Sequence, residues 1–341
     1  MVYALERKIA ELAVERACVL ASAVAASHQL GSVSKSDHSP VTVADFGAQG
    51  IIIGALQHAF PADPIVGEEE SSFLRKDAAL RDRVWSLVKD ASRTSSAATT
   101  ETIGVIESEE ALMDYIDKGQ FEGGSGIHRM WALDPIDGTK GFLRSGQYAV
   151  CLALIVDGVT VVGVIGCPNL LVDPADESRG RGVIFSSVIG EGAFARALGT
   201  MPESATSISM NKLTDTSAAS FCESVEAGHS SHAQQAQIAA KLGITKPSVR
   251  MDSQAKYASI SRGDGDIYLR LPVSATYEEK IWDHASGNLL VTEAGGIVSD
   301  MYGNPLNFTQ GRTLRKNKGI VAACKELHPK VIAAVQAVLE G

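Results

Sequence analysis

Asp134 and Asp137 stand three positions apart across a Pro-Ile step, in the segment LDPIDGTKGFL at 133–143. The apolar residues 130–133 that precede them predict a buried strand ending at Asp134. Pro135 has a fixed φ and favours an extended conformation at the residue before it. The two carboxylates are therefore expected to lie on a stiff turn at the end of a buried strand.

Gly138 and Thr139 follow directly and are typical of a tight turn that starts a helix. Unpaired backbone N–H groups at a helix start attract anions. Two carboxylates beside such a group repel an anion unless a cation lies between them. The segment therefore predicts a site that binds metal and phosphate together.

Further acidic residues fall at the ends of other expected elements. Asp45 lies in the first turn of an expected helix, Glu68 and Glu69 follow a short apolar strand, and Asp283 lies near the start of another helix. Taken alone, Asp45 or Asp283 is typical of a helix cap. The run of glutamates at 68–70, taken alone, is typical of a solvated turn. The combination DPIDGT is more specific, because packing alone does not require it.

Oxygen ligands without a nearby Cys or His pair favour a hard cation, and Mg²⁺ first. Several carboxylates around one site suit two ions about 3.5–4 Å apart, which together hold the attacking and leaving oxygens. A phosphoryl group is the natural substrate for such an arrangement.

The composition is that of an ordinary globular protein, and 341 residues suffice for two domains or one large one. A formal charge of −9 argues against nucleic-acid binding, so any phosphate must be held by metal and a few placed cations. The five cysteines have no metal or disulfide spacing and are expected to be reduced and mostly buried, as in a cytoplasmic protein.

No run approaches the roughly 20 apolar residues that cross a bilayer, so no membrane partner is expected. The stretch 17–26 resembles the apolar core of a signal peptide. Glu6, Glu11 and Glu15 precede it, however, and favour an ordinary amphipathic helix.

The first part of the chain, 1–205, is expected to form an α+β domain. It combines helices at 4–29 and from Val43, a strand at 65–69, helical patches within 71–128, and hairpins at 148–168 and 181–196. The Ser/Thr/Ala tract 91–102 is expected to be a mobile surface loop, either a lid beside an active site or decoration.

From 206 to 341 the expected strands and helices alternate, which predicts a smaller α/β domain. Its expected strands are SFCESVE, SVRMD, DIYLRL and GGIVSD, and its expected helices lie at 232–242, from Gln254, from Ile281 and at 327–340.

Three motifs in this order carry a resemblance that covers almost the whole chain. DPIDGTKGF, VGEE after an upstream VTVAD, and WDHASGNLLVTEAGG resemble the Mg²⁺-dependent, lithium-sensitive phosphatase superfamily of inositol monophosphatase and fructose-1,6-bisphosphatase. The resemblance implies a layered αβαβα sandwich with its site between two domains. The segment 71–128 matches least well, and Ser286 stands where alanine is common.

The second half narrows the resemblance to one subfamily. VEAGHSSH, DSQAKYASI, DIYLRLP and YEEKIWDHASGN are similar to the 3′(2′),5′-bisphosphate nucleotidases, above all to their fungal branch linked to salt tolerance. This implies removal of the 3′-phosphate of adenosine 3′,5′-bisphosphate, action on 3′-phosphoadenosine 5′-phosphosulfate, a place in sulfur assimilation, and inhibition by Li⁺ and Na⁺.

The resemblance also implies roles for particular residues. Two or three Mg²⁺ ions would be held by Glu68, Asp134, Asp137, Asp283 and the Ile136 carbonyl. The attacking water would be positioned and deprotonated by Asp45 and Thr139, and the scissile phosphate held by the N–H groups of Gly138 and Thr139. The nucleotide would contact His229, Ser253, Lys256, Arg270 and Asp283.

Two other functions remain open at this point. An inositol phosphate phosphatase that removes a 1-phosphate shares the metal core, and only His229, Lys256 and Arg270 argue against it. A metal- and nucleotide-binding sensor without activity is disfavoured by the intact set of acids. The sequence does not set the oligomeric state, and a monomer is compatible with it.

Overall fold

The computed structural model describes residues 2–27, 31, 33–34, 40–225, 232–272, 274 and 276–339. Its helices are α1 (Ala4–Ser27), α2 (Val43–Ala59), α3 (Ser72–Lys76), α4 (Ala78–Thr94), α5 (Ala97–Ile103), α6 (Glu109–Asp117), α7 (Thr139–Leu143), α8 (His232–Leu242), α9 (Ala255–Ser261), α10 (Ala285–Glu293) and α11 (His328–Leu339).

The strands form two larger sheets and one short pair. The pair is β1 (Val33–Ser34) with β2 (Pro40–Val41). The seven-stranded sheet holds β3 (Ile65–Gly67), β4 (Arg129–Asp137), β5 (Ala149–Val156), β6 (Val159–Leu171), β7 (Arg181–Val188), β8 (Gly192–Ala197) and β9 (Thr206–Ile208). The five-stranded sheet holds β10 (Phe221–Glu223), β11 (Val249–Arg250), β12 (Ile267–Arg270), β13 (Gly296–Ser299) and β14 (Ile320–Cys324).

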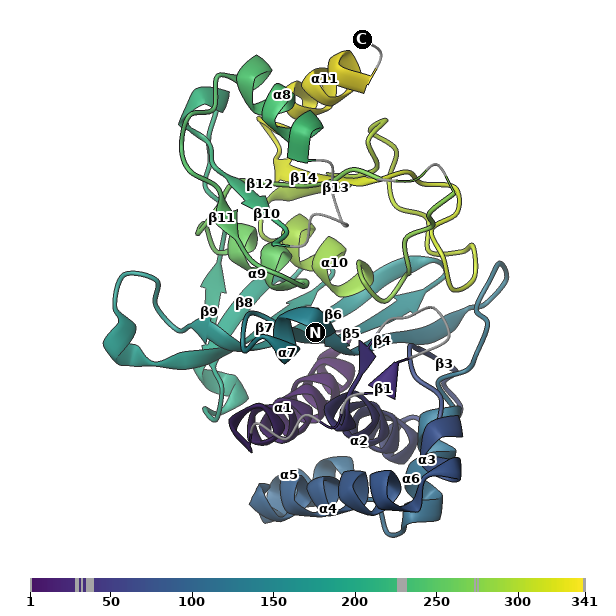
Figure 1. Cartoon of the computed structure of the whole chain (residues 1–341). Coiled ribbons are helices and arrows are strands. Elements are labelled where there is room, and N and C mark those ends of the chain that lie inside the picture. The colour runs from purple at the N-terminus through teal and green to yellow at the C-terminus, as the bar shows by residue number, and fades with distance from the viewer. Residues whose placement is uncertain are drawn as a thin grey trace.

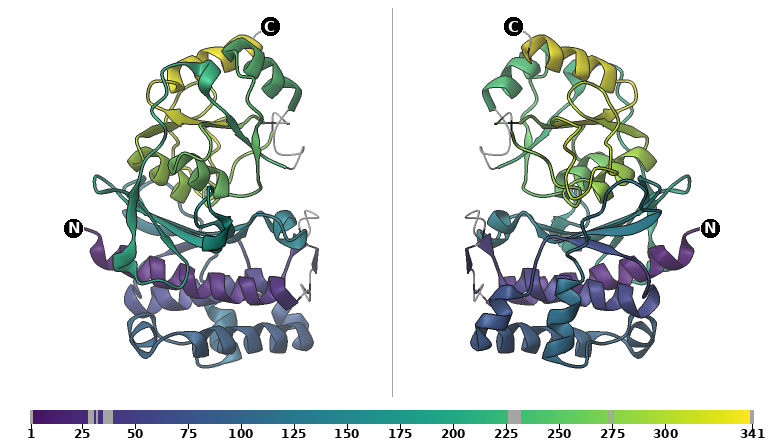
Figure 2. Two further views of the ribbon diagram at one scale, coloured as in Figure 1. Left: turned by 90° about the vertical axis from the view of Figure 1, so that its left-hand side faces the viewer. Right: turned by 90° about the vertical axis from the view of Figure 1, so that its right-hand side faces the viewer.

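Helices and sheets alternate in layers (Figure 1). α8 and α11 cover the outer face of the five-stranded sheet, and α9 and α10 lie between the two sheets. α1 and α2 cover the other face of the seven-stranded sheet, as both side views show (Figure 2). The predicted αβαβα sandwich is confirmed.

The two sheets differ in the order and in the direction of their strands. In the larger sheet the strands follow chain order from β3 to β9, and every pair is antiparallel except β3–β4. Its predicted hairpin turn at Asp157-Gly158 is confirmed, and both residues have the positive φ that such a two-residue turn requires. The smaller sheet has the order β11-β10-β12-β14-β13, with β10 parallel to β11 and β12.

A bulge in β4 shapes the segment DPIDG at 134–138. Asp134 pairs with Cys151 and Asp137 pairs with Ala149, so one extra residue is accommodated opposite β5. Pro135 lies in this bulge, where its missing N–H costs no ladder hydrogen bond. The prediction that the strand ends at Asp134 was therefore wrong, because the bulge carries the strand on to Asp137.

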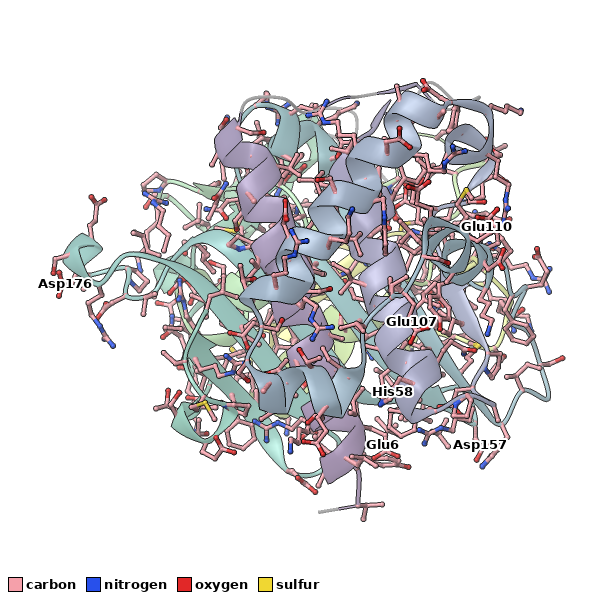
Figure 3. The ribbon with its side chains drawn as sticks, turned by 90° about the horizontal axis from the view of Figure 1, so that it is seen from below. Glu6, His58, Glu107, Glu110, Asp157 and Asp176 are labelled. Atoms are coloured by element: carbon pink, nitrogen blue, oxygen red, sulfur yellow. The ribbon has the colours of Figure 1, made fainter. Side chains whose placement is uncertain are left out.

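An outer layer of helices, α3 to α6, packs beyond α1 and α2 (Figure 1). Seen from below, α4 crosses this face, and the exposed side chains of Glu107 and Glu110 lie at its side (Figure 3). The segment 71–128, which resembled the family least, thus adds a layer outside the sandwich.

Most of the tract 91–102 is helical, in the end of α4 and in α5, so the predicted loop is wrong. The tract belongs to the outer layer beyond α1 and α2, which favours the alternative of decoration over a lid (Figure 1). Ser96 caps α5 by accepting a hydrogen bond from the N–H of Thr99 at 3.1 Å. Ile103 at the other end is buried in the core under α1 and α2. A capped start and one apolar anchor are enough to hold this polar tract as a helix.

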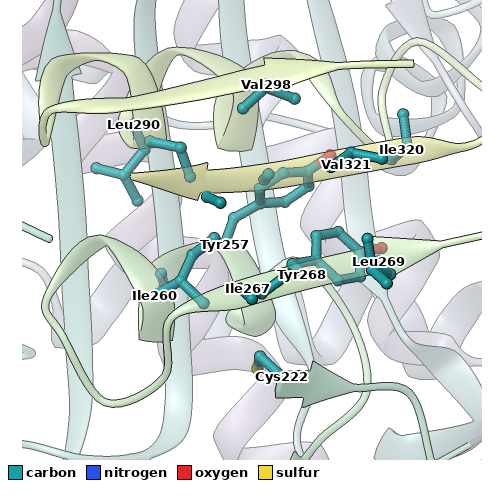
Figure 4. Packing of buried hydrophobic residues seen from close by; sticks show 14 of the residues in the cluster. Cys222, Tyr257, Ile260, Ile267, Tyr268, Leu269, Leu290, Val298, Ile320 and Val321 are labelled. Atoms are coloured by element: carbon teal, nitrogen blue, oxygen red, sulfur yellow. The ribbon is translucent and has the colours of Figure 1, made fainter. Parts of the chain in front are cut away.

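Apolar packing is continuous across the smaller sheet and the layer beneath it. Tyr257, Ile260 and Leu290 from α9 and α10 meet residues of β12, β13 and β14 such as Leu269 and Val321 (Figure 4). The same cluster includes residues of β5, β6 and β7, so the two sheets share one core. The boundary proposed between residues 205 and 206 stays a prediction.

All five cysteines are buried and free of disulfides, as predicted. None of the helices in the described part of the chain has an apolar stretch long enough to cross a membrane.

Candidate functional site

A cavity of about 490 Å³ gathers residues from both sheets and from the turns that follow them. The predicted site residues that line it are Glu68, Asp134, Ile136, Asp137, Gly138, Thr139, Ser253, Lys256, Arg270 and Asp283. His229 lies outside the described residues. Asp45 is buried and does not line the cavity. The structure thus brings together ten of the predicted residues from segments up to 215 positions apart (283 − 68).

Asp134 is the most deeply buried of the acids in the cavity wall, with 2% of its surface exposed. Its Oδ1 atom has no hydrogen-bond partner within the described residues. Burial, and then the charges of Glu68, Asp137, Asp283 and Asp45, raise the pKa of Asp134 well above its ordinary value. A buried carboxylate with an unpaired oxygen is costly, and a cation beside it would remove that cost.

Burial also raises the pKa values of the neighbouring acids Asp137 and Asp283. Burial raises the pKa of Asp137 to about 6, although Lys256, a hydrogen bond from the N–H of Gln254 and Arg270 all oppose the rise. Burial, against the opposing charge of Arg270, also raises the pKa of Asp283 well above its ordinary value. Hard oxygen ligands that repel one another in this way fit a divalent cation such as Mg²⁺.

Asp45 is held at the start of α2 by a reciprocal cap. Its Oδ2 atom accepts hydrogen bonds from the N–H of Thr42 at 2.8 Å and from Thr42 Oγ1 at 2.6 Å, while Thr42 Oγ1 accepts from the N–H of Ala44. Its charge still acts on Asp134 in the cavity wall. The cap that its position suggested is therefore real, and it fixes this carboxylate beside the acids of β4.

Gly138 and Ser253 meet at the wall of the cavity, and both have left-handed backbones, with φ of 82° and 69°. A Cβ on Gly138 would lie 2.9 Å from the Cβ of Ser253, so only glycine allows this approach. Positive φ at a serine is uncommon and collects at functional sites. Gly138 precedes Thr139, the first residue of α7, whose Oγ1 donates to the Ile136 carbonyl at 3.1 Å.

Two basic side chains form another part of the cavity wall. Lys256 is buried at 4% exposure, and its Nζ donates to the Ser253 carbonyl at 2.9 Å. Burial lowers the pKa of Lys256, while the charge of Asp137 opposes the fall. Arg270 lies 3.7 Å from Asp283 through Nη2 and Oδ2, at the end of β12. The cavity therefore joins a cluster of acids to a pair of cations.

Comparison with known families matches residues 3–340 to the inositol monophosphatase family. The chain belongs to that family. It is 54% identical over the full length of both chains to the 3′(2′),5′-bisphosphate nucleotidase of Emericella nidulans. It is 51% identical to that of Schizosaccharomyces pombe, over 98% of this chain and 95% of the relative.

Solved structures of more distant relatives share the fold. The Thermotoga maritima IMPase matches 96% of this chain and 95% of its own at a TM-score of 0.62 and 18% identity. CysQ from Bacteroides thetaiotaomicron, described as a bacterial member of the inositol monophosphatase family, matches 96% of this chain and all of its own at a TM-score of 0.58 and 20% identity.

Gln49 and Arg312, which the sequence analysis did not predict, hold the acids of this family member in place. Gln49 of α2 brackets Glu69, accepting from its N–H at 2.9 Å and donating to its carbonyl at 2.6 Å. Arg312 donates to the Gly67 carbonyl and lies 4.8 Å above the ring of Trp282. The loop that carries Glu68 is thereby tied to the turn that carries Asp283.

Gln254 provides a second connection between the halves of the site. Its N–H donates to Asp137 Oδ2 at 2.6 Å, and its side-chain amide donates to the Trp282 carbonyl at 2.8 Å. Its Oε1 accepts from Ser286 Oγ at 2.8 Å. Ser286, which stands where alanine is common, thus holds the side chain of Gln254, a contact that was not predicted from the motif.

Proposed function

We propose that this chain is a 3′(2′),5′-bisphosphate nucleotidase that converts adenosine 3′,5′-bisphosphate to AMP and phosphate, and that also acts on 3′-phosphoadenosine 5′-phosphosulfate. The observation that carries the proposal is the meeting of acids and cations in one cavity. A substrate with one phosphate to be cleaved and another to be kept has the charge pattern that such a cavity suits. Relatives of this name match the whole chain at 54% and 51% identity.

The proposal includes two or three Mg²⁺ ions per site. Glu68, Asp134, Asp137 and Asp283 would hold them through carboxylates, and Ile136 through its carbonyl. Bound Mg²⁺ would supply charge neutralisation of the phosphate and of the departing oxygen, and would acidify water. The orphaned Oδ1 of Asp134 and the raised pKa values of the three aspartates support this assignment.

The chain's own groups would then carry out an in-line displacement. Thr139 and Asp45 would position the attacking water, and its proton would pass through the Thr139 hydroxyl, which lines the cavity, to the Asp45 carboxylate as the water oxygen bonds to phosphorus. The N–H groups of Gly138 and Thr139 bind the oxygens of the scissile phosphate. The bond between phosphorus and the 3′-oxygen breaks, and that oxygen takes a proton from solvent. No covalent protein intermediate is needed.

Lys256, Arg270 and Ser253 would hold the part of the nucleotide that does not react, together with His229 and with Asp283 at the junction. Arg270 suits a phosphate because its planar guanidinium can offer two parallel donors, whereas Lys256 acts as a point charge. Lys256 is buried and the Arg270 side chain is 14% exposed, which strengthens their interaction with a phosphate relative to fully exposed cations.

The deciding experiment is phosphate release from adenosine 3′,5′-bisphosphate and from inositol 1-phosphate, each with Mg²⁺ and with a chelator. We expect Mg²⁺-dependent turnover that strongly prefers the nucleotide. Preference for inositol 1-phosphate would replace the proposal with an inositol phosphate phosphatase. Nucleotide binding without turnover of either substrate would identify a sensor.

Arg270→Ala is expected to lower kcat/KM for adenosine 3′,5′-bisphosphate roughly 10–150-fold, the equivalent of losing one charge-assisted contact of about 1.5–3 kcal/mol. Most of the loss should appear in KM, because the contact is the same in the ground and transition states. Weak inositol 1-phosphate hydrolysis should change little. The control is Arg315→Ala, an exposed arginine outside the cavity. Equal losses on both substrates would show that Arg270 serves the shared phosphate or the fold.

A further inference from the structure

A chain of buried polar side chains lies behind Arg270. Glu279 accepts a hydrogen bond from Arg270 Nε at 3.0 Å through Oε1 and faces His284 Nε2 at 3.1 Å through Oε2. The other ring nitrogen of His284 lies 2.9 Å from the hydroxyl of Tyr257. Glu279 is 4% exposed and His284 fully buried. Apolar side chains would fill this space at lower desolvation cost, so stability alone does not explain why these hydrogen-bonded polar residues are buried here.

A metal site does not explain it. Single ligand atoms of Glu279, Asp283 and His284 all lie within 4.8 Å of one another. Both oxygens of Glu279 already face donors, however, and both nitrogens of His284 have partners. Burial alone would raise the pKa of Glu279, yet Arg270 and His284 lower it to about 2. Glu279 is therefore an anion whose charge is already balanced by its neighbours.

These hydrogen bonds fix the direction of the Arg270 guanidinium. Glu279 holds Nε, and Tyr277 accepts from Nη2 through its hydroxyl at 3.1 Å. The same Nη2 stands 3.7 Å from Asp283, longer than a hydrogen bond. Arg270 is thus hydrogen-bonded to Glu279 and not to Asp283, and it still lines the cavity.

We propose that Glu279 is a positioning residue for substrate specificity, which holds Arg270 in the orientation that receives the phosphate retained by the nucleotide. The proposal rests on the proposed function of the same cavity. Without the Glu279 charge, Asp283 is the carboxylate nearest to Arg270, and the always-charged guanidinium turns towards it. Arg270 is then drawn away from the retained phosphate.

The test is a double-mutant cycle on AMP binding, measured by calorimetry with Mg²⁺ present. Glu279→Gln keeps the side-chain shape and removes the charge, and we expect it to weaken AMP binding about tenfold. In the Arg270→Ala background the same change should weaken binding less than about twofold further, because Glu279 acts through Arg270. The KM for adenosine 3′,5′-bisphosphate should rise with AMP Kd, while kcat stays within about threefold.

Glu278→Gln is the matched control, because it is the same substitution one residue earlier, at an exposed side chain bonded to Thr313. It should leave AMP binding unchanged. If Glu279→Gln does not fold, as judged by thermal unfolding, the cycle is run with Glu279→Met, which also removes the charge and keeps a side chain of similar length.

Three results overturn the inference. They are unchanged or tighter AMP binding in the Glu279 variant, an effect equal to that of Glu278→Gln, or a loss of the same size with and without Arg270. Each can occur in an enzyme that still hydrolyses adenosine 3′,5′-bisphosphate with an Arg270-dependent KM. Failure of the wild type to bind AMP or hydrolyse the bisphosphate would instead refute the proposed function.

Discussion

Asparagine in place of Asp134 is expected to lower kcat/KM by more than about 100-fold and to weaken Mg²⁺ binding by a similar factor. Changing a partner that only touches a metal ligand commonly costs about 10–100-fold in affinity or activity, and loss of a ligand itself should exceed that. Asp134 is buried at 2% exposure, and its Oδ1 has no other hydrogen-bond partner in the described chain.

The same variant should be more stable than the wild type when metal is removed. Burial and the charges of Glu68, Asp137, Asp283 and Asp45 raise the pKa of Asp134 well above its ordinary value, so the ionised form destabilises the metal-free protein. Asparagine has nearly the same shape and no charge. The stability difference should shrink as pH falls, because Asp134 then takes up a proton and becomes neutral as well.

Calorimetric Mg²⁺ titration, steady-state kinetics and thermal unfolding with chelator check the two effects together. Asp82→Asn is the control, since it makes the same change at an exposed position of α4 in the outer layer. A metal-free Asp134→Asn protein that unfolds at a lower temperature than the wild type would contradict the reading of these acids as a cation site. Full activity of the variant would contradict it as well.

Local patterns were enough to predict most elements of the fold. The period of apolar residues located α1, α2 and the hairpin strands, and Asp157-Gly158 marked its turn because two adjacent positive φ values suit few other residues. Patterns failed where long-range contacts decide the structure. The tract around α5 is polar enough for a loop, but Ile103 anchors it in a core built from α1 and α2. The bulge at Pro135 depends on its pairing with β5.

The site likewise contains residues that a sequence motif predicts and residues that only the folded structure reveals. Glu68, Asp134, Asp137 and Asp283 are found by motif, because each sits at the end of an element where a ligand is expected. The residues that hold them, such as Gln254 and Arg312, have no local signal. Their partners lie far away in the chain, as in the contact of Gln254 with Asp137, 117 positions apart. The burial of Glu279 could not be predicted either, because a glutamate in the segment YEEK is typical of a solvated residue.

Loss of the Asp45 carboxylate or of the Thr139 hydroxyl is expected to cut kcat by about 10²–10⁴-fold, the usual contribution of a positioned base. Nucleotide affinity should change less, since neither residue is assigned to the retained phosphate. Thr139→Ser keeps the hydroxyl and should keep most activity, whereas Thr139→Ala should not. Retained activity in Thr139→Ala would remove this residue from the mechanism.

Asp45 needs a separate control, because it also caps α2. Asp45→Asn can still accept from the N–H and hydroxyl of Thr42 through its amide oxygen, so the cap is largely kept while the base is lost. Thr42→Val does the reverse, since it removes the hydroxyl of the cap and leaves the carboxylate in place. It should lower the free energy of unfolding by about 0.5–2 kcal/mol, as loss of a helix cap does.

The two variants therefore separate chemistry from structure at a single helix start. If Asp45 acts on the attacking water, Asp45→Asn loses kcat by the factor given above with little change in thermal stability. Thr42→Val should then lose stability and keep kcat within about tenfold of the wild type. Equal losses of kcat in both variants would mean that Asp45 serves only to hold the first turn of α2 beside Asp134. The water would then have to be activated by groups that line the cavity itself, since Asp45 lies behind its wall.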